Sequence, residues 1–289
     1  MFRKFSTTNL IPMAIGIAGI AAASLIFSSC GGGSEEHPEL KDIEVTTDTV
    51  SSEVRVNFDL VRVNIPKPAE LTSKLSAAKI NYNKSFLLSS GKGGGFSSNY
   101  QKAIGMGAFG ADLGIAAAHN QPQDALEYLT QISKLATDLG ISSAFDPEFA
   151  KQLMSSVSKP DTFQLMLDKA FDKAERNLRS NQRVATTVLM IAGGWVESLY
   201  ISVEALSTNP TDAKAKPIYF DISTHCYSFK YIFELLDAYK SNADCAKLIQ
   251  DLEPAKATLT GAGSTPKMGP DALPKIREAV TALRNKITS

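Results

Sequence analysis

The chain has 289 residues, of which 44% are hydrophobic, so it can form one sizeable core. Its 30 Lys and Arg side chains balance 30 Asp and Glu side chains, and the formal net charge is +0. This balance lacks the bulk positive charge of nucleic-acid-binding proteins, and we expect no nucleic-acid partner. With only 3 histidines and no metal-binding or cofactor-binding motif, we expect no metal and no cofactor.

The N-terminus has the pattern of a secretory signal peptide over residues 1–29. Arg3 and Lys4 form a short basic region, and an apolar stretch follows from Leu10 to Phe27. The sequence LIFSSC then ends at Cys30 and resembles a bacterial lipobox, in which the cysteine carries the lipid, including palmitate, and becomes the first residue. The alternative is an ordinary N-terminal membrane anchor with an incidental cysteine.

Residues 30–42 are expected to form a flexible tether, because three glycines and a polar run follow the cysteine. We therefore expect the mature protein to be anchored by lipid to the outer membrane, on its periplasmic face or at the cell surface. The remaining residues, 43–289, are expected to form a single domain.

The first part of this domain, residues 43–65, is predicted to be an extended arm containing two short strands. Apolar residues alternate with polar ones, first at Val54, Val56, Phe58 and Leu60 and then, shifted by one position, at Val61, Val63 and Ile65. Alternation with a period of two is typical of strands, and the shift indicates a bulge or a change of face.

Helical signals dominate the rest of the chain. Apolar periodicity and capping residues predict helices over 69–80, 100–118, 123–139, 146–157, 162–179, 183–206, 221–240, 243 onward and 273–287. The charged face of the helix at 162–179 is expected to be solvated. These elements predict an all-α domain, with the β-containing arm as its only extended part.

The helix at 183–206, RVATTVLMIAGGWVESLYISVEAL, is apolar on every side over its first half. Such a helix is either a central core helix or a membrane span. Glu197 and Glu204 interrupt it before the roughly 20 apolar residues that a span needs. We therefore predict that it is the buried centre of a multi-helix bundle.

Small residues form a stripe on the helix at 100–118, at Ala103, Gly107, Gly110, Ala111, Gly114 and Ala118. The residues 105–110 match the pattern G-x-G-x-x-G literally, but no strand precedes them and no βαβ unit surrounds them, so they do not predict a dinucleotide site. A packing surface is the better interpretation. We expect the stripe to face Gly193 and Gly194 of the central helix.

Asp112 and Glu197 each interrupt an otherwise apolar stretch. Placed near the helix crossing, they would form one buried polar cluster. Two carboxylates could perform acid–base chemistry or bind a cation. Alternatively, each could bind a backbone amide, an arginine such as Arg183, or a tyrosine, and this structural role is the favoured interpretation. Trp195 and Tyr200, on the same helix as Glu197, are further candidate ligand-binding residues.

A second candidate group lies on the helix predicted at 221–240. Asp221 and His225 are four residues apart and would share a helix face, but one such pair is a weak metal signal. Asp221 would also serve as a helix N-cap. Seven aromatic residues lie between Tyr219 and Tyr239, and they could line a ligand groove or pack in the core.

Segments between residues 100 and 206, including GAFGADLGIAAAHNQPQDALEYL and NQRVATTVLMIAGGWVESLY, resemble helical lipoproteins of Bacteroidota to which no activity is assigned. Phe109 stands where those proteins carry a tyrosine. The resemblance implies an outer-membrane lipoprotein and supplies no activity.

The sequence thus favours a lipid-anchored, non-catalytic helical protein that binds an envelope protein or a small ligand. One alternative is an envelope hydrolase that uses Asp112, Glu197 or His225. Another is a solute-binding partner of an outer-membrane transporter, which would expose an aromatic groove.

Overall fold

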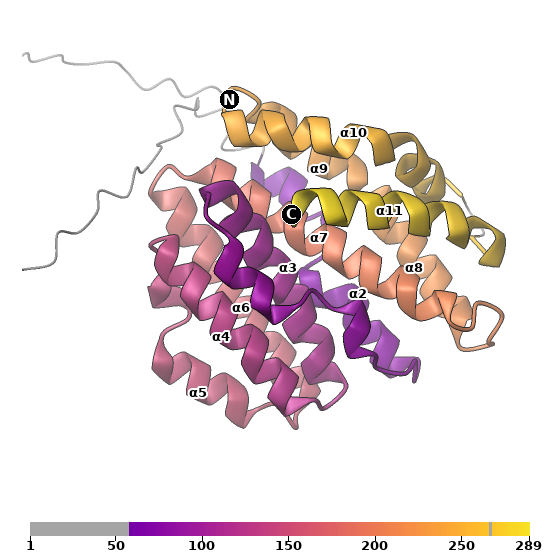
Figure 1. Ribbon diagram of the computed structural model, residues 1–289, viewed down its shortest axis with the longest axis horizontal. Coiled ribbons are helices and arrows are strands. Elements are labelled where there is room, and N and C mark those ends of the chain that lie inside the picture. The colour runs from indigo at the N-terminus through magenta and orange to yellow at the C-terminus, as the bar shows by residue number, and fades with distance from the viewer. Residues whose placement is uncertain (1–57, 266–267) are drawn as a thin grey trace, which may run out of the picture. The chain divides into compact units, whose positions relative to one another are not determined.

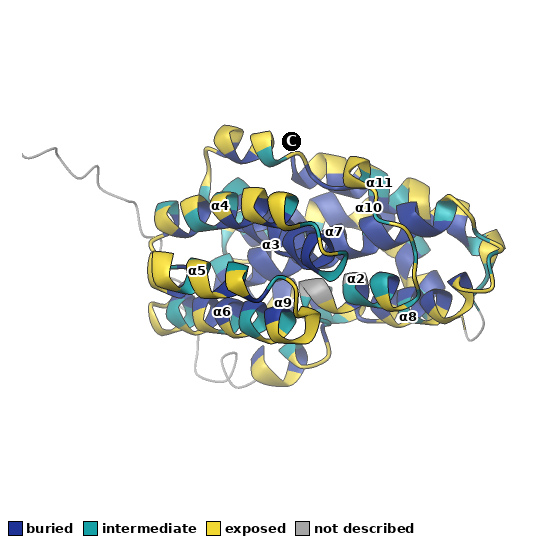
Figure 2. Cartoon of the chain, turned by 90° about the horizontal axis from the view of Figure 1, so that it is seen from below, coloured by how far each residue is buried: buried dark blue, intermediate teal, exposed yellow. Residues whose placement is uncertain are grey.

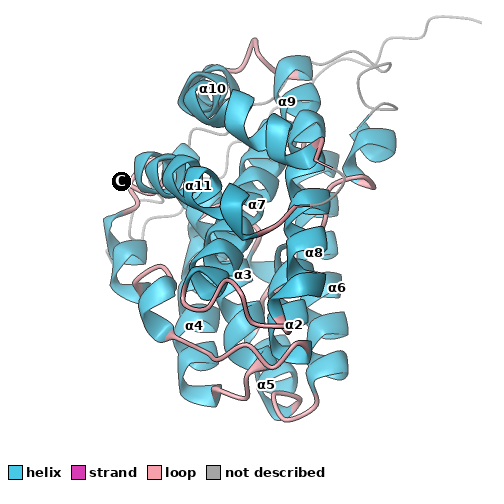
Figure 3. Ribbon diagram, turned by 90° about the vertical axis from the view of Figure 1, so that its right-hand side faces the viewer, coloured by secondary structure: helices cyan, strands magenta, loops and turns pink. Residues whose placement is uncertain are grey.

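The computed structural model describes residues 58–265 and 268–289, and these residues form helices with no strand among them (Figures 1 and 3). The longer helices are α2 (Pro68–Ala77), α3 (Asn99–Ala118), α4 (Pro122–Asp138), α5 (Pro147–Ser155), α6 (Pro160–Ser180), α7 (Val184–Ser207), α8 (Ala215–Tyr227), α9 (Phe229–Ala238), α10 (Ala243–Gly263) and α11 (Leu273–Ile287). The proposed signal peptide, Cys30, the tether and residues 43–57 lie outside the described residues.

The helices α3 and α7 form the centre of the fold and share its most extensive interface. Helices α2 and α4 pack on α3, whereas α11 packs on α7 and α10 packs on α8, α9 and α11. In Figure 2, α3 and α7 are buried along most of their length, and the surrounding helices expose one face. The prediction of an all-α bundle around a central apolar helix is confirmed.

Among the described residues, α7 is the one helix with the length and apolar composition of a membrane span. Within its most apolar 18-residue window, 89% of the residues are buried inside the protein. The charge of Glu197 is also neutralised inside the domain by Arg284 of α11, and Glu204 is paired with Arg277, whose side chain is 52% exposed. This helix therefore forms the core of the bundle.

Glycines allow the backbones of α3 and α7 to touch. A Cβ atom at Gly107 would overlap the carbonyl oxygen of Met190, and one at Gly193 would overlap that of Ile104. The expected contact between the two glycine patches is confirmed at these positions. Not all of the stripe faces α7, however, because a Cβ atom at Gly110 would meet the ring of Phe171 on α6.

The strand predicted for the last part of the arm is wrong. Residues 58–62 are helical, and residues 63–65 form a turn. Phe58, Val61 and Ile65 are buried while Leu60 and Val63 are exposed, with exposed fractions of 65% and 80%. This spacing of three and four residues is that of a helix face, and it coexists with the alternation that predicted a strand.

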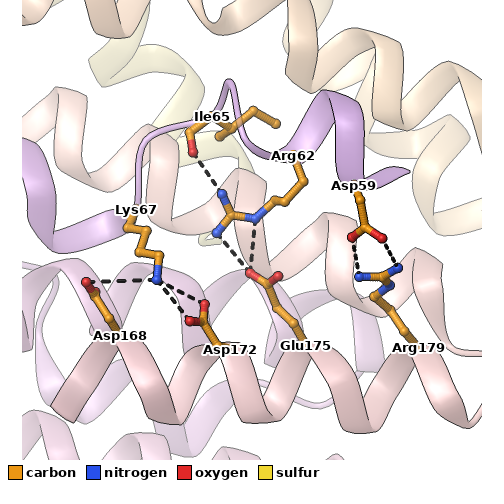
Figure 4. Close-up of polar contacts among 8 residues, drawn as sticks. All are labelled: Asp59, Arg62, Ile65, Lys67, Asp168, Asp172, Glu175 and Arg179. Atoms are coloured by element: carbon orange, nitrogen blue, oxygen red, sulfur yellow. Dashed lines mark hydrogen bonds and ion pairs between the residues drawn. The ribbon is translucent and has the colours of Figure 1, made fainter. Parts of the chain in front are cut away.

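The same segment explains the charged face of α6, which is not simply solvated. Figure 4 shows Arg62 and Lys67 reaching across to three acidic residues of α6. Arg62 binds Glu175 at 2.9 Å and also donates to the carbonyl of Ile65. Lys67 lies 3.0 Å from Asp172 and 3.9 Å from Asp168.

In a further ion pair the charges are reversed, because α6 supplies the positively charged side chain. Arg179 binds both carboxylate oxygens of Asp59, at 2.6 and 3.0 Å, and its guanidinium lies 4.5 Å from the centre of the Phe58 ring. These contacts with α6 join residues far apart in the chain, so local alternation could not reveal them.

The helix predicted over 221–240 is in fact two helices, because α8 begins earlier and ends at Tyr227 while α9 begins at Phe229. Asp221 is therefore not an N-cap. It lies inside α8 and forms an ion pair with Lys74 of α2 at 2.7 Å. At the break, the Ser228 hydroxyl donates to the His225 carbonyl at the end of α8.

We predict that Gly107→Ala and Gly193→Ala each lower the free energy of unfolding by about 1–3 kcal/mol, because the added methyl group forces two backbones apart. Gly261→Ala is the matched control, since Gly261 also lies in a helix but an added Cβ atom there would have no neighbour within 4 Å. It should be neutral or stabilise by up to about 1 kcal/mol through helix propensity. Urea denaturation of the three variants measures this, and equal stabilities would contradict the packing role.

Candidate functional site

Asp112 of α3 and Glu197 of α7 lie together where the two helices cross, as the positions of the glycines predicted. Both residues are 0% exposed. Their carboxyl groups are within hydrogen-bonding reach of each other. The expected buried polar cluster is therefore present.

The third member of the cluster is Arg284 of α11. Its Nε donates to Glu197 Oε2 at 2.7 Å and its Nη2 donates to Glu197 Oε1 at 2.5 Å, which is a bidentate ion pair. The guanidinium also lies 4.0 Å from the centre of the Tyr200 ring and 3.3 Å from the carbonyl oxygen of Phe86. Glu197 thus has a full positive partner inside the protein.

Asp112 has no such partner. Its Oδ1 accepts a 3.4 Å hydrogen bond from the backbone N–H of Leu88, and its Oδ2 has no donor among the described residues. Burial, followed by the charge of Glu197, raises the pKa of Asp112 well above its usual range, and this outweighs the lowering effect of Arg284. Both effects favour the protonated form of Asp112, which could donate its proton to Glu197.

With Asp112 in its protonated form, the cluster has no net charge, since one neutral carboxylic acid accompanies one carboxylate and one guanidinium. Burial lowers the pKa of Arg284, but its hydrogen bonds to Glu197 and the charge of that residue more than compensate, so the guanidinium stays charged. This neutrality meets the requirement that buried charges be paired.

The cluster is closed to solvent. Its two carboxyl-bearing side chains, Asp112 and Glu197, are 0% exposed, and Arg284 is 9% exposed. Acid–base catalysis needs a substrate within hydrogen-bonding distance of the catalytic group. The geometry therefore favours a structural role for the two carboxyl groups.

Trp195 is also buried, with 1% of its surface exposed. Its ring stacks on that of His225, at a centroid distance of 4.7 Å, and on that of Phe229, at 5.0 Å. Its indole N–H donates to the Ser228 hydroxyl at 2.7 Å. Trp195 thus links α7 to the junction of α8 and α9. Its side chain is too deeply buried to contact a ligand.

His225 is fixed in the same contact. Its Nε2 lies 2.9 Å from the carbonyl oxygen of Trp195, which makes Nε2 the protonated nitrogen. Complete burial lowers the pKa of His225 to about 4, so the ring is neutral at physiological pH. Its expected partner Asp221 binds Lys74 instead, and no group of three potential metal ligands occurs among the described residues.

The aromatic residues between Tyr219 and Tyr239 divide into two sets. Tyr219, Phe229 and Tyr239 are buried in the core. Phe220 and Tyr227 are 69% and 51% exposed and line a surface cavity of about 220 Å³. Core packing is therefore confirmed for the first three residues, whereas a ligand groove at Phe220 and Tyr227 stays a prediction.

Comparison of the chain with protein-family models, with curated proteins and with solved structures gives no match. The resemblance to lipoproteins of Bacteroidota remains a prediction from the sequence, and the function must be argued from the structure itself.

Arg284 is the residue of the site that sequence reasoning missed. Arg183, the partner that the sequence suggested, instead donates to the carbonyl of Leu139. A signal for Arg284 was present, because it lies four residues after Val280 and three before Ile287, on the apolar face of α11. A charged residue on a buried helix face requires a partner of opposite charge.

We predict that Glu197→Gln and Asp112→Asn differ sharply in stability. Glu197→Gln leaves Arg284 buried without a counter-charge and should cost about 3–5 kcal/mol. Asp112→Asn should cost at most about 1 kcal/mol, because the neutral amide can donate to Glu197 as the protonated acid does.

The double variant provides the control for a shared cluster. Its loss of stability should differ from the sum of the two single losses by at least about 0.5 kcal/mol, since the groups share hydrogen bonds. Denaturant unfolding of the three variants measures all of these quantities. Equal costs for the two single substitutions would show that Asp112 is ionised in the folded protein.

Proposed function

We propose that this protein is a non-catalytic, lipid-anchored helical domain of the cell envelope that binds a ligand at its surface. The observation that carries the proposal is the contrast between interior and surface. The two carboxyl groups and the histidine that could act in catalysis are buried in the core. The exposed aromatic residues Phe220 and Tyr227, in contrast, line an open cavity. Exposed large apolar side chains beside a cavity are typical of binding sites.

Anchoring through Cys30 rests on the sequence of the first 30 residues. A basic start, an apolar stretch and a cysteine where that stretch ends are the features of a lipoprotein signal. The mature domain would then follow a polar, glycine-containing tether. This arrangement holds a binding domain near the membrane while leaving it free to reorient.

The alternative of an envelope hydrolase has less support. Asp112, Glu197 and His225 are each at most 1% exposed, so water and substrate cannot reach them in this conformation. A solute-binding partner of an outer-membrane transporter is the second candidate, and the observation that favours it is the exposed aromatic cavity. Both of the binding roles require a ligand site at the surface.

We predict that Cys30→Ser abolishes labelling of the protein by an alkyne analogue of palmitate and leaves the uncleaved precursor in the cells. Cys226→Ser is the matched control, because that thiol is buried in the domain and should not accept a lipid. It should be labelled as strongly as the unmodified protein. Undiminished labelling of the Cys30→Ser variant would contradict lipid anchoring at this residue.

A further inference from the structure

A shallow groove lies between α8 and the C-terminal end of α10. Its walls are formed by four residues of α8, the last residue of α10 and the two residues that follow it: Phe220, Ser223, Thr224, Tyr227, Gly263, Ser264 and Thr265. The cavity has a volume of about 220 Å³. Hydroxyl groups and aromatic rings dominate its lining, and no carboxylate, ammonium or guanidinium group of the described residues lines it.

The α8 side of the groove departs from the usual pattern of a surface helix. Phe220, Ser223, Thr224 and Tyr227 follow one another at intervals of three, one and three residues and therefore share one helix face. Apolar residues with this spacing normally point into the core. Here the two aromatic side chains at its ends are exposed, and they are separated by about 10 Å along the helix axis.

The end of α10 completes the groove because Gly263 permits a close approach. A Cβ atom at Gly263 would overlap the backbone of Tyr227. The hydroxyl of Ser223 lies 3.1 Å from the carbonyl oxygen of Ala262 and 3.2 Å from that of Thr265. These contacts fix the distance between the two walls, so the groove is formed before any ligand arrives.

The exposed ring of Tyr227 is also held in place. Lys230 donates a 2.6 Å hydrogen bond to its hydroxyl, and the ammonium lies 3.9 Å from the ring centre. The ring of Tyr231 meets it edge to face at a centroid distance of 6.3 Å. An ordered aromatic side chain loses little conformational entropy when a ligand binds to it.

We propose that this groove binds a neutral saccharide chain. Sugars combine apolar C–H faces, which stack on aromatic rings, with hydroxyl groups, which exchange hydrogen bonds with Ser and Thr side chains. Two aromatic residues whose positions lie about 10 Å apart along the helix axis can contact separate sugar units of one chain. No charged group of the described residues lines the cavity itself, although the Lys230 ammonium lies beside the Tyr227 ring, and this lining matches a ligand without charge.

A protein partner fits the groove less well. A stable protein interface buries about 800 Å² on each partner. The other exposed large apolar residues of the described chain do not line this cavity: Leu60, Val63, Leu126 and Leu165. The saccharide assignment rests on the proposed binding function and gives it a ligand class.

The test is calorimetric titration of the full chain, purified in a detergent without a sugar headgroup, with four probes. These are neutral hexasaccharides of glucose, mannose, galactose and N-acetylglucosamine. We expect saturable binding of at least one of them, weakened about tenfold by Phe220→Ala and by Tyr227→Ala. Tyr227→Phe keeps the ring and should retain most of the affinity.

Leu165→Ala is the matched control, because Leu165 is exposed to a similar extent, 54%, but lies on α6 away from the groove. It should bind the saccharide unchanged. Three results would overturn the proposal: no saturable binding of any of the four probes, binding that neither aromatic substitution weakens, or binding of apolar peptides with the same sensitivity in place of sugars. Labelling at Cys30 in the same variants reports separately on the anchored state.

Discussion

The charge of Glu197 is buried completely in the central helix, and the packing of several other segments follows from the need to neutralise it. Arg284 does so from α11, although it lies 87 residues further along the chain. Its guanidinium reaches Glu197 only when α11 lies against α7. Removing one partner of such a pair leaves an unpaired buried charge, which is far more costly than the pair itself is stabilising. The ion pair therefore specifies this helix arrangement more than it adds to stability.

The same cluster also forms hydrogen bonds with the segment that precedes α3, at Phe86 and Leu88. Leu88 donates its backbone N–H to Asp112 and accepts a 3.0 Å hydrogen bond from the Tyr128 hydroxyl, while Arg284 lies 3.3 Å from the Phe86 carbonyl oxygen. Helices α3, α4, α7 and α11 are thus joined through one set of polar contacts. Close approach of α3 and α7 at their glycines excludes water from this set, which strengthens each hydrogen bond and favours the protonated form of Asp112.

Features of the fold that depend on local sequence patterns could be predicted from the sequence. An uninterrupted apolar helix, paired small-residue patches and two isolated carboxylates indicated the central helix and the buried cluster correctly. The partner Arg284 was missed because ion pairing depends on tertiary structure. Residues 58–65 were wrongly predicted to form a strand because their contacts also depend on tertiary structure. Arg62 and Lys67 bind α6 across more than 100 residues of sequence. Trp195, chosen as a ligand residue, is held by the α8–α9 junction, which local periodicity did not indicate.

The central claim is that Asp112 is a neutral acid that serves the structure of the core while ligand binding takes place at the surface. Infrared spectroscopy of the folded protein in D₂O at neutral pH tests this most directly, because a protonated carboxylic acid has a C=O stretch distinct from that of a carboxylate. The account predicts one such band that resists exchange with solvent and disappears in Asp112→Asn. The absence of this band in the unmodified protein would show that Asp112 is ionised and would contradict the account.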